Sequence, residues 1–295
     1  MKILLTGASG QLGRSIKILK PKDFELITLS KFDLNILDKN KLREKIKSYK
    51  PDWVINAAAY TNVDDAETNQ ELALKVNRDG PKFISEILSD LGGNLLHIST
   101  DFVFDGFSSV PYKPNDKANP ISVYGNSKLL GEKEIGKVFY LKNRAIILRT
   151  SWLMGPYGKN FAKTMLNLHN TQDTISVVKD QFGCLTSTFS LANICWKIIN
   201  KKDSNNELKF PLIMHWCDKG VTNWYEIADE IGNIGIKLNI INKKAKVIPI
   251  KTNEYPYIAQ RPLYSVLDIK ETQNFLNINA LNWRESLLKS FKNYS

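Results

Sequence analysis

The chain has 295 residues, 43% of them hydrophobic, and a formal net charge of +11 from 41 basic and 30 acidic side chains. Its lysines are scattered and lack interleaved aromatic residues, which argues against nucleic-acid binding, and no apolar stretch approaches the ~20 residues that span a bilayer. Because no signal peptide begins the chain and its three cysteines lack CxxC spacing, we expect a cytoplasmic protein without disulfides or a zinc site.

The first half of the sequence alternates between two kinds of segment. Apolar runs bounded by Gly, Pro, Asn or Asp predict buried strands, and segments of helical period between them predict helices. The predicted strands are 2–5, 24–29, 53–56, 94–99 and 145–148, and the predicted helices are 11–20, 39–49 and 71–91. This alternation is typical of an α/β protein with a Rossmann-type, doubly wound parallel sheet.

After residue 150 the alternation is less regular. Helices are predicted at 161–170, 187–200, 224–234 and 283–291, and short apolar runs lie at 175–178, 212–216 and 247–250. We therefore expect residues 1–150 to form a dinucleotide-binding domain, to which later segments can return, and residues 151–295 to form mainly a smaller α/β substrate lobe. No linker rich in Pro, Gly or Ser separates them, so they should meet at an interface.

A glycine-rich turn follows the first predicted strand and reads Thr6-Gly7-Ala8-Ser9-Gly10-Gln11-Leu12-Gly13. Glycine permits a tight turn and lets backbone amides approach a pyrophosphate, which the positive end of the next helix also attracts. Such a turn by itself is also compatible with ordinary turn chemistry. Its place directly after a buried N-terminal strand favours dinucleotide binding.

The strongest catalytic signal is Tyr124-Gly125-Asn126-Ser127-Lys128. Residues four apart share one helix face, and an ammonium beside a phenol lowers the pKa of the tyrosine, which makes Tyr124 a proton donor to a carbonyl oxygen. An isolated pair of this spacing is usually an exposed surface pair. Upstream, however, Thr100 and Asp101 end an apolar strand, where a doubly wound sheet places its site.

Two further segments suit a cofactor site. Small residues in Asn56-Ala57-Ala58-Ala59 follow the third predicted strand and would let a flat cofactor lie against the backbone, although simple packing explains them as well. Asn77 lies in a predicted helix, which asparagine disfavours. It either holds water or backbone near the active site or has an ordinary capping or surface role.

The end of the second strand bears on the choice of dinucleotide. An NAD-specific site usually places an acidic residue about 20 residues past the glycine turn, but this chain has Ser30 and Lys31 there. A hydroxyl and an ammonium attract a 2′-phosphate, which a carboxylate would repel. The sequence therefore predicts NADPH as the favoured cofactor, with NADH also accepted.

Taken together, these segments resemble the extended short-chain dehydrogenase/reductases, and among them the dTDP-4-dehydrorhamnose reductase family, over nearly the whole chain. The main blocks are LLTGASGQLG at 4–13, VINAAAYT at 54–61, STDFVFDG at 99–106, YGNSKLLGE at 124–132, RTSW at 149–152, and RP at 261–262. The family pattern differs at Asn35, where an aspartate is usual.

The resemblance implies a role for each matching residue. Tyr124 would be the proton donor, Lys128 would bind the nicotinamide ribose and tune Tyr124, and Thr100 would assist at the reacting carbonyl. Thr100, Asp101 and Trp152 would contact the substrate. Gly10, Gln11 and Leu12 would contact the pyrophosphate, and Ala59, Tyr60 and Thr61 would lie along the cofactor. We expect the cofactor site also to include Gly7, Gly13, Ser30, Lys31, Asn35, Ile36, Ala58, Tyr124 and Lys128.

The implied activity is NAD(P)H-dependent reduction of the 4-keto group of dTDP-4-dehydro-β-L-rhamnose, a step in the synthesis of cell-surface polysaccharide such as lipopolysaccharide, by a monomer or homodimer. Two alternatives stay open: a reductase of another 4-keto-6-deoxy sugar nucleotide, and a non-catalytic regulatory subunit that binds a dinucleotide. Retention of Tyr124, Lys128 and Thr100 argues against the second. No residues are assigned to magnesium or another metal.

Overall fold

The computed structural model describes residues 1–140, 142–204 and 210–292. Its centre is a six-stranded sheet in the order β10-β5-β4-β3-β1-β2, in which every neighbouring pair is parallel. The strands are β1 (Lys2–Thr6), β2 (Glu25–Leu29), β3 (Trp53–Asn56), β4 (Asn94–Thr100), β5 (Ala145–Thr150) and β10 (Ile213–His215). The predicted α/β class with a Rossmann-type sheet is confirmed.

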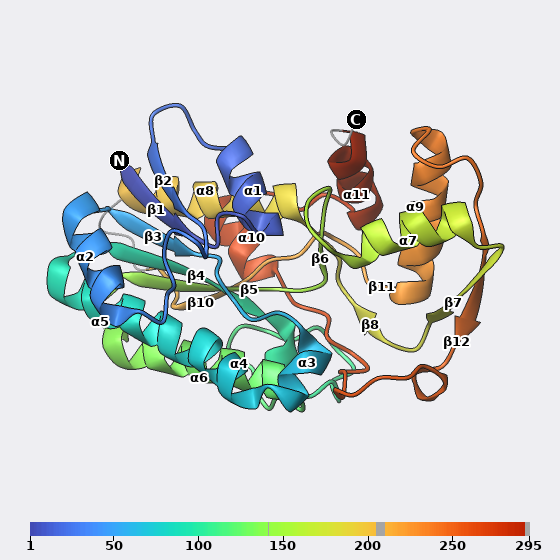
Figure 1. Cartoon of the computed structure of the whole chain (residues 1–295), viewed down its shortest axis with the longest axis horizontal. Coiled ribbons are helices and arrows are strands. Elements are labelled where there is room, and N and C mark those ends of the chain that lie inside the picture. The colour runs from blue at the N-terminus through green and yellow to red at the C-terminus, as the bar shows by residue number, and fades with distance from the viewer. Residues whose placement is uncertain (141, 205–209, 293–295) are drawn as a thin grey trace.

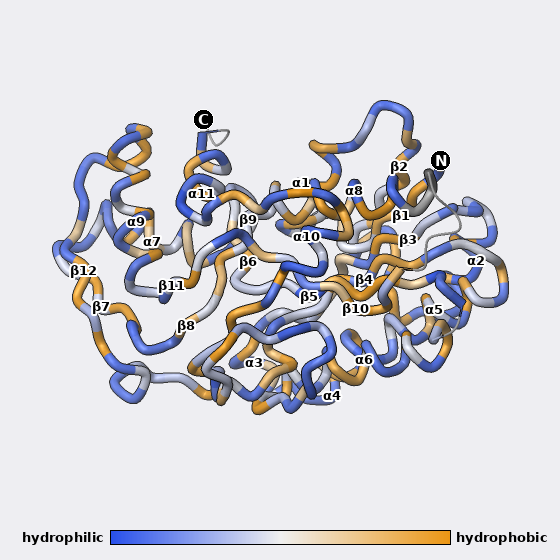
Figure 2. The backbone as a smooth tube through the Cα atoms, turned by 180° about the vertical axis from the view of Figure 1, so that it is seen from behind, coloured by the Kyte–Doolittle hydropathy of each residue, from blue (hydrophilic) through white to orange (hydrophobic). Residues whose placement is uncertain are grey.

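Helices cover both faces of this sheet (Figure 1). One face carries α1 (Gln11–Ile18), α8 (Thr188–Ser204) and α10 (Lys270–Leu276), and the other carries α2 (Lys39–Tyr49), α5 (Gly80–Leu91) and α6 (Val123–Phe139). Side chains alternate along a strand, so Ile3 and Leu5 pack in the core beneath α1 and α8, whereas Leu4 packs in the core beneath α2 and α5. Figure 2 shows hydrophobic residues along the central strands, as this double burial requires.

A second lobe lies beside the C-terminal ends of the strands (Figure 1). It contains α7 (Phe161–Thr171), α9 (Trp224–Lys237) and α11 (Trp283–Lys292) around their own hydrophobic core, with β7 (Thr174–Val178) paired to β12 (Lys246–Ile250). Two short ladders also lie in this part of the chain: β6 (Leu153–Met154) pairs with β9 (Thr186–Ser187), and β8 (Phe182–Gly183) pairs with β11 (Thr222–Asn223). Within the described residues, no helix has the length and apolar composition needed to cross a membrane.

The segment predicted as one helix at 71–91 differs in the structure. It consists of α4 (Gln70–Leu74), a π-helical turn (Lys75–Asp79) and α5, and an unpredicted short helix, α3 (Val63–Thr68), precedes it. Pro81 has no amide hydrogen to donate within the helix, and α6 packs so closely that a Cβ atom at Gly131 would lie 2.1 Å from the Asn77 carbonyl oxygen. Both features favour a local change of helical pitch, which is frequent at functional sites.

Candidate active site

A cavity of about 880 Å³ lies where β1, β3, β4 and β5 end, between the sheet and the second lobe. This edge is where parallel α/β sheets bind ligands. The first domain contributes the glycine turn, the alanines after β3 and the Tyr124 motif, and the second lobe contributes an aromatic wall. The lining residues used below are Gly10, Gln11, Leu12, Gly13, Ala59, Thr61, Thr100, Asp101, Tyr124, Lys128, Trp152, Lys159, Trp224 and Arg261.

The glycine turn has the form that a dinucleotide requires. Gly7 has φ of +69°, and a Cβ atom there would lie 2.6 Å from the Ala57 carbonyl carbon, so only glycine lets β1 and β3 end side by side. The turn leads into α1, whose first amides have no intrahelical partners. Gly10, Gln11, Leu12 and Gly13 all line the cavity. A pyrophosphate therefore fits this end of the site.

The Tyr124–Lys128 motif is held at the other side of the same cavity by the start of α6. Ser122 caps the helix by accepting a hydrogen bond from the Gly125 amide at 3.1 Å. A Cβ atom at Gly125 would lie 2.1 Å from the Phe102 carbonyl oxygen, so this glycine lets α6 approach the segment after β4. As a result, Tyr124, Lys128 and Thr100 line one wall together.

The side chain of Tyr124 is half-buried and lines the cavity. Burial raises its pKa to about 12, the charge of Asp101 acts in the same direction, and a hydrogen bond with Thr100 opposes both. The direction is opposite to the one expected from the sequence, because desolvation of the phenolate outweighs any neighbouring cation. Tyr124 is therefore a phenol at neutral pH and releases its proton only to a strong base.

The ammonium of Lys128 is more enclosed, with the residue 2% exposed. Its Nζ lies 2.6 Å from the Ile98 carbonyl oxygen and 3.3 Å from His97 Nε2. Burial lowers the pKa of Lys128 to about 8, although the Glu132 carboxylate acts against this shift. Lys128 thus titrates close to the neutral range.

Thr100 is the last residue of β4, and Asp101 directly follows it. The Thr100 hydroxyl donates to Asp101 Oδ1 at 3.1 Å and accepts from the Phe102 amide at 3.2 Å. Asp101 is 1% exposed, and burial raises the pKa of its carboxyl to about 7 against the hydrogen bonds of Ser265 and Thr100. It is the sole acidic side chain among the described residues that line the cavity.

Asn77 connects the cofactor side of the cavity to the catalytic helix. Its side chain accepts from the Tyr60 amide and donates to the Tyr60 carbonyl and to Ser127 Oγ, each at 2.9 Å. Of the two roles considered from the sequence, the structure supports the one in which Asn77 holds backbone near the site. It ties the segment after β3 to the turn of α6 between Tyr124 and Lys128.

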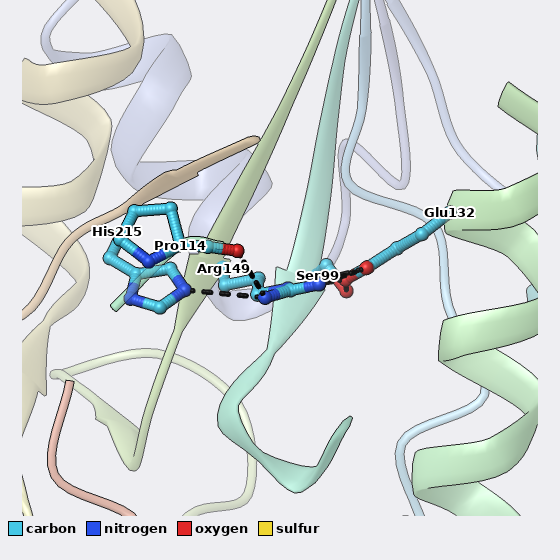
Figure 3. A network of polar contacts seen from close by, with 5 residues as sticks. All are labelled: Ser99, Pro114, Glu132, Arg149 and His215. Atoms are coloured by element: carbon cyan, nitrogen blue, oxygen red, sulfur yellow. Dashed lines mark hydrogen bonds and ion pairs between the residues drawn. The ribbon is translucent and has the colours of Figure 1, made fainter. Parts of the chain in front are cut away.

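A buried ion pair, unassigned in the sequence, joins α6 to β5 (Figure 3). Arg149 of β5 donates to both carboxylate oxygens of Glu132 on α6, with contacts of 2.6–3.2 Å, and both side chains are 3% exposed. Ser99 Oγ also donates to Glu132. On its other side, Arg149 contacts the Pro114 carbonyl oxygen at 3.3 Å and His215 at 3.4 Å.

The second lobe supplies aromatic and positively charged side chains to the opposite wall of the cavity. Trp152, in a left-handed conformation with φ of +42°, stacks on Trp224 with ring centroids 4.1 Å apart. Lys159 and Arg261 add positive charge to the lining. Arg261 also pairs with Asp64 at 2.6 Å. Within 1–140, 142–204 and 210–292, no group of three or more His, Cys, Asp or Glu side chains is placed to hold a metal ion.

Several residues predicted for the cofactor lie outside the cavity lining. Gly7, Ala58 and Tyr60 sit next to lining residues, whereas Ser30, Lys31, Asn35 and Ile36 lie farther along the chain at the end of β2 and beyond it. Lys31 is exposed and Ile36 is buried. The amide and hydroxyl of Ser30 both donate to Asp33 Oδ2, at 2.8 and 2.6 Å. The sequence did not reveal this acidic group beside Ser30, because Asp33 lies three residues farther along the chain and the turn brings it back.

The sheet order and a Tyr–Lys pair facing the glycine turn define a dinucleotide-dependent oxidoreductase of the short-chain dehydrogenase/reductase type. The model of the family described as "RmlD substrate binding domain" matches residues 1–295, so the chain belongs to this family. A dTDP-4-dehydrorhamnose reductase of Aggregatibacter actinomycetemcomitans is 37% identical over 100% of this chain and 99% of its own length.

Solved structures agree over the same extent. A dTDP-4-dehydrorhamnose reductase from Clostridium acetobutylicum superposes with a TM-score of 0.89 at 39% identity, and one from Bacillus anthracis, in complex with NADP, superposes with a TM-score of 0.88 at 32% identity. In both cases the match covers 99% of each chain. The similarity therefore includes both the sheet and the second lobe.

Proposed function

We propose that this protein is an NADPH-dependent reductase that converts dTDP-4-dehydro-β-L-rhamnose to dTDP-β-L-rhamnose, in the pathway that supplies rhamnose for cell-surface polysaccharide. The observation that carries this proposal is one cavity with a glycine turn at one end and Tyr124, Lys128 and Thr100 on its wall. Whole-length relatives named dTDP-4-dehydrorhamnose reductase support the substrate, and the NADP-bound relative supports the cofactor.

The residues suit this reaction. NADPH, when bound, supplies the hydride that is added to carbon 4 of the sugar. Gly10 to Gly13 and the N-terminus of α1 would hold its pyrophosphate, and Lys128 would hold the nicotinamide ribose. Tyr124 would transfer its proton to the sugar oxygen as negative charge develops there, and the Thr100 hydroxyl would turn from Asp101 Oδ1 to donate its hydrogen bond to the same oxygen. A phenol with a pKa of about 12 keeps its proton until that alkoxide forms.

The charges and rings of the cavity suit a nucleotide sugar. Lys159 and Arg261 would contact the diphosphate, because guanidinium and ammonium groups both bind phosphate oxygens. The stacked Trp152 and Trp224 rings would provide a flat apolar surface to the substrate. We also infer that the enzyme works in the cytoplasm. It should be a monomer or a homodimer, and light scattering of the purified protein distinguishes these two states.

The test is an assay of the purified protein with NADPH and dTDP-4-dehydro-β-L-rhamnose, in parallel with other 4-keto-6-deoxy sugar nucleotides. We expect oxidation of NADPH and formation of dTDP-β-L-rhamnose, with a higher kcat/KM than for the other sugars. A higher kcat/KM for another 4-keto-6-deoxy sugar nucleotide would identify that sugar as the substrate instead. Binding of NADPH without turnover of any of them would indicate a regulatory subunit instead.

A further inference from the structure

A chain of buried hydrogen bonds runs through the sheet from β1 to Lys128. Asn56 Oδ1, at the end of β3, accepts from the Thr6 hydroxyl at 2.7 Å and from the Ala58 amide at 3.2 Å. Asn56 Nδ2 lies 3.0 Å from His97 Nδ1 on β4, and His97 Nε2 lies 3.3 Å from Lys128 Nζ. Thr6, Asn56, His97 and Lys128 are each at most 2% exposed.

The direction of these bonds determines where His97 carries its proton. A backbone amide can only donate, so the Asn56 atom facing Ala58 must be the oxygen, and the amide nitrogen of Asn56 must face His97. His97 Nδ1 therefore accepts a hydrogen bond. Burial and the charge of Lys128 lower the pKa of His97 well below its usual value, so the ring is neutral and has a single proton, on Nε2.

The Nε2–H group points at the nitrogen of Lys128. An ammonium has donors alone, whereas a neutral amine offers a lone pair to this N–H. We propose that His97 is a positioning residue that, locked by Asn56 as the Nε2–H tautomer, destabilises the ammonium form of Lys128 and so sets the alkaline limit of turnover. The Nε2–H tautomer of His97 follows from the hydrogen-bond geometry alone. The effect on the alkaline limit of turnover rests on the proposed function.

The other titratable groups near Lys128 are Glu132, Tyr124 and Asp101, of which Glu132 acts against His97. On the same helix, Glu132 favours the ammonium, but its carboxylate is already paired with Arg149 from β5 and accepts from Ser99 of β4. Tyr124 and Asp101 line the same cavity, and the charge of Asp101 acts on the phenol. Burial and the His97 donor therefore work in the same direction on Lys128.

Histidine nitrogen NMR tests the tautomer without any substrate. The chain has three histidines, so substitution of each one assigns its signals. We expect a protonated Nε2 and an unprotonated Nδ1 for His97. His215 provides an internal contrast, because its Nδ1 faces the Tyr112 carbonyl oxygen at 3.1 Å and should carry the proton. A protonated Nδ1 on His97, or an imidazolium at neutral pH, would overturn the proposal.

The same signals followed from about pH 6 to about pH 10 should report the titration of Lys128. We expect His97 Nε2 to shift near the pKa of Lys128, at about 8, and Lys128→Met to abolish this shift. A shift that survives in Lys128→Met would contradict the pairing of the two residues.

The kinetic test compares His97→Leu and His97→Gln with His169→Gln, a buried histidine whose Nε2 contacts Ala228 in the second lobe. The pH profile of kcat/KM reports groups of the free enzyme. We expect both His97 variants to move the alkaline limb of kcat/KM upward by about one pH unit, and His169→Gln to leave it in place. An unmoved limb would refute the link to turnover. Inactivity of the wild-type enzyme toward keto sugars would refute the proposed function while the NMR still decides the tautomer.

Discussion

At the residue scale, the proposed chemistry depends most on the phenol of Tyr124. Tyr124→Phe keeps the ring but removes the proton donor, so we expect kcat to fall by about 10²–10⁴-fold with NADPH binding retained. Tyr140→Phe is the matched control, since Tyr140 is 76% exposed just after the end of α6. Steady-state kinetics and NADPH titration measure both quantities. Turnover near the wild-type level in Tyr124→Phe would remove this residue from the mechanism.

The raised pKa of Asp101 predicts that the free energy of unfolding falls as the pH rises. Because burial raises its pKa from 3.8 to about 7 in the folded state, the folded protein retains a proton that the unfolded chain releases, and stability falls as pH rises between these values. Asp101→Asn removes this loss, on the order of 4 kcal/mol at full ionisation. Urea unfolding should show the variant gaining more stability at about pH 8 than at about pH 5. An equal gain at both values would contradict the assignment.

Asp33 should limit the preference for NADPH. The Asp33 carboxylate already accepts hydrogen bonds from the Ser30 hydroxyl and amide. Its negative charge would also repel a 2′-phosphate placed beside Ser30. We expect Asp33→Asn to raise the ratio of kcat/KM for NADPH over NADH by about threefold to tenfold, a modest change because the group is solvated. Asp23→Asn, at an exposed loop position, should leave the ratio unchanged. A ratio that falls in Asp33→Asn would show that the phosphate lies elsewhere.

Residues with a local signature could be predicted from the sequence, and residues joined only by the fold could not. The glycine turn and the Tyr124–Lys128 pair each lie within nine residues, so their spacing alone predicts a common site. Glu132, Arg149 and His215 come from a helix and two strands, and their contacts depend on the order of strands in the sheet. His97 carried no signal for the same reason, because Asn56 and Lys128 are 41 and 31 residues away.

At the element scale, the Glu132–Arg149 pair fixes α6 against β5. Glu132→Gln leaves a buried guanidinium without its counter-charge, so we expect a loss of about 3–5 kcal/mol in the free energy of unfolding. Glu71→Gln is the matched control, because Glu71 forms an exposed pair with Lys75 on α4, and such pairs contribute little. Denaturant unfolding of the two variants measures the difference. Equal stabilities would show that the buried pair does not hold the helix.

Most of the long elements were predicted within a few residues, although the segment 71–91 contains three elements and the bounds of α6 were not predicted. The shortest elements were missed for a physical reason. The five strands predicted in the first half match β1 to β5, since continuous apolar runs are what a sheet buried on both faces requires. The two-residue strands β6, β8, β9 and β11 are too short to show periodicity. Helix α3 has six residues, of which one, Ala66, is buried, so it leaves no amphipathic pattern either.

At the scale of the whole molecule, the two parts of the chain are interwoven. Strand β10 pairs with β5, and α8 packs against α1, where Trp196 Nε1 donates to the Ile16 carbonyl oxygen at 3.1 Å. Asn160 also reaches across the cavity to Gln11 at 2.9 Å. Periodicity predicts each of these elements but carries no information on which neighbour it joins. The cavity depends on such long-range contacts, because both parts contribute to its lining.

One of these long-range contacts joins Asp64, near the start of α3, to the segment 258–261 in the second half of the chain. Asp64 Oδ1 accepts from the Ile258 and Ala259 amides at 3.2 and 3.0 Å, and Oδ2 pairs with Arg261. Since Arg261 lines the cavity, Asp64→Ala should raise KM for the sugar nucleotide by about tenfold, while KM for NADPH changes far less. Asp173→Ala, which removes an exposed pair with Lys243, should change neither. Equal increases in both constants would mean that Asp64 supports the whole fold and not the substrate side of the cavity.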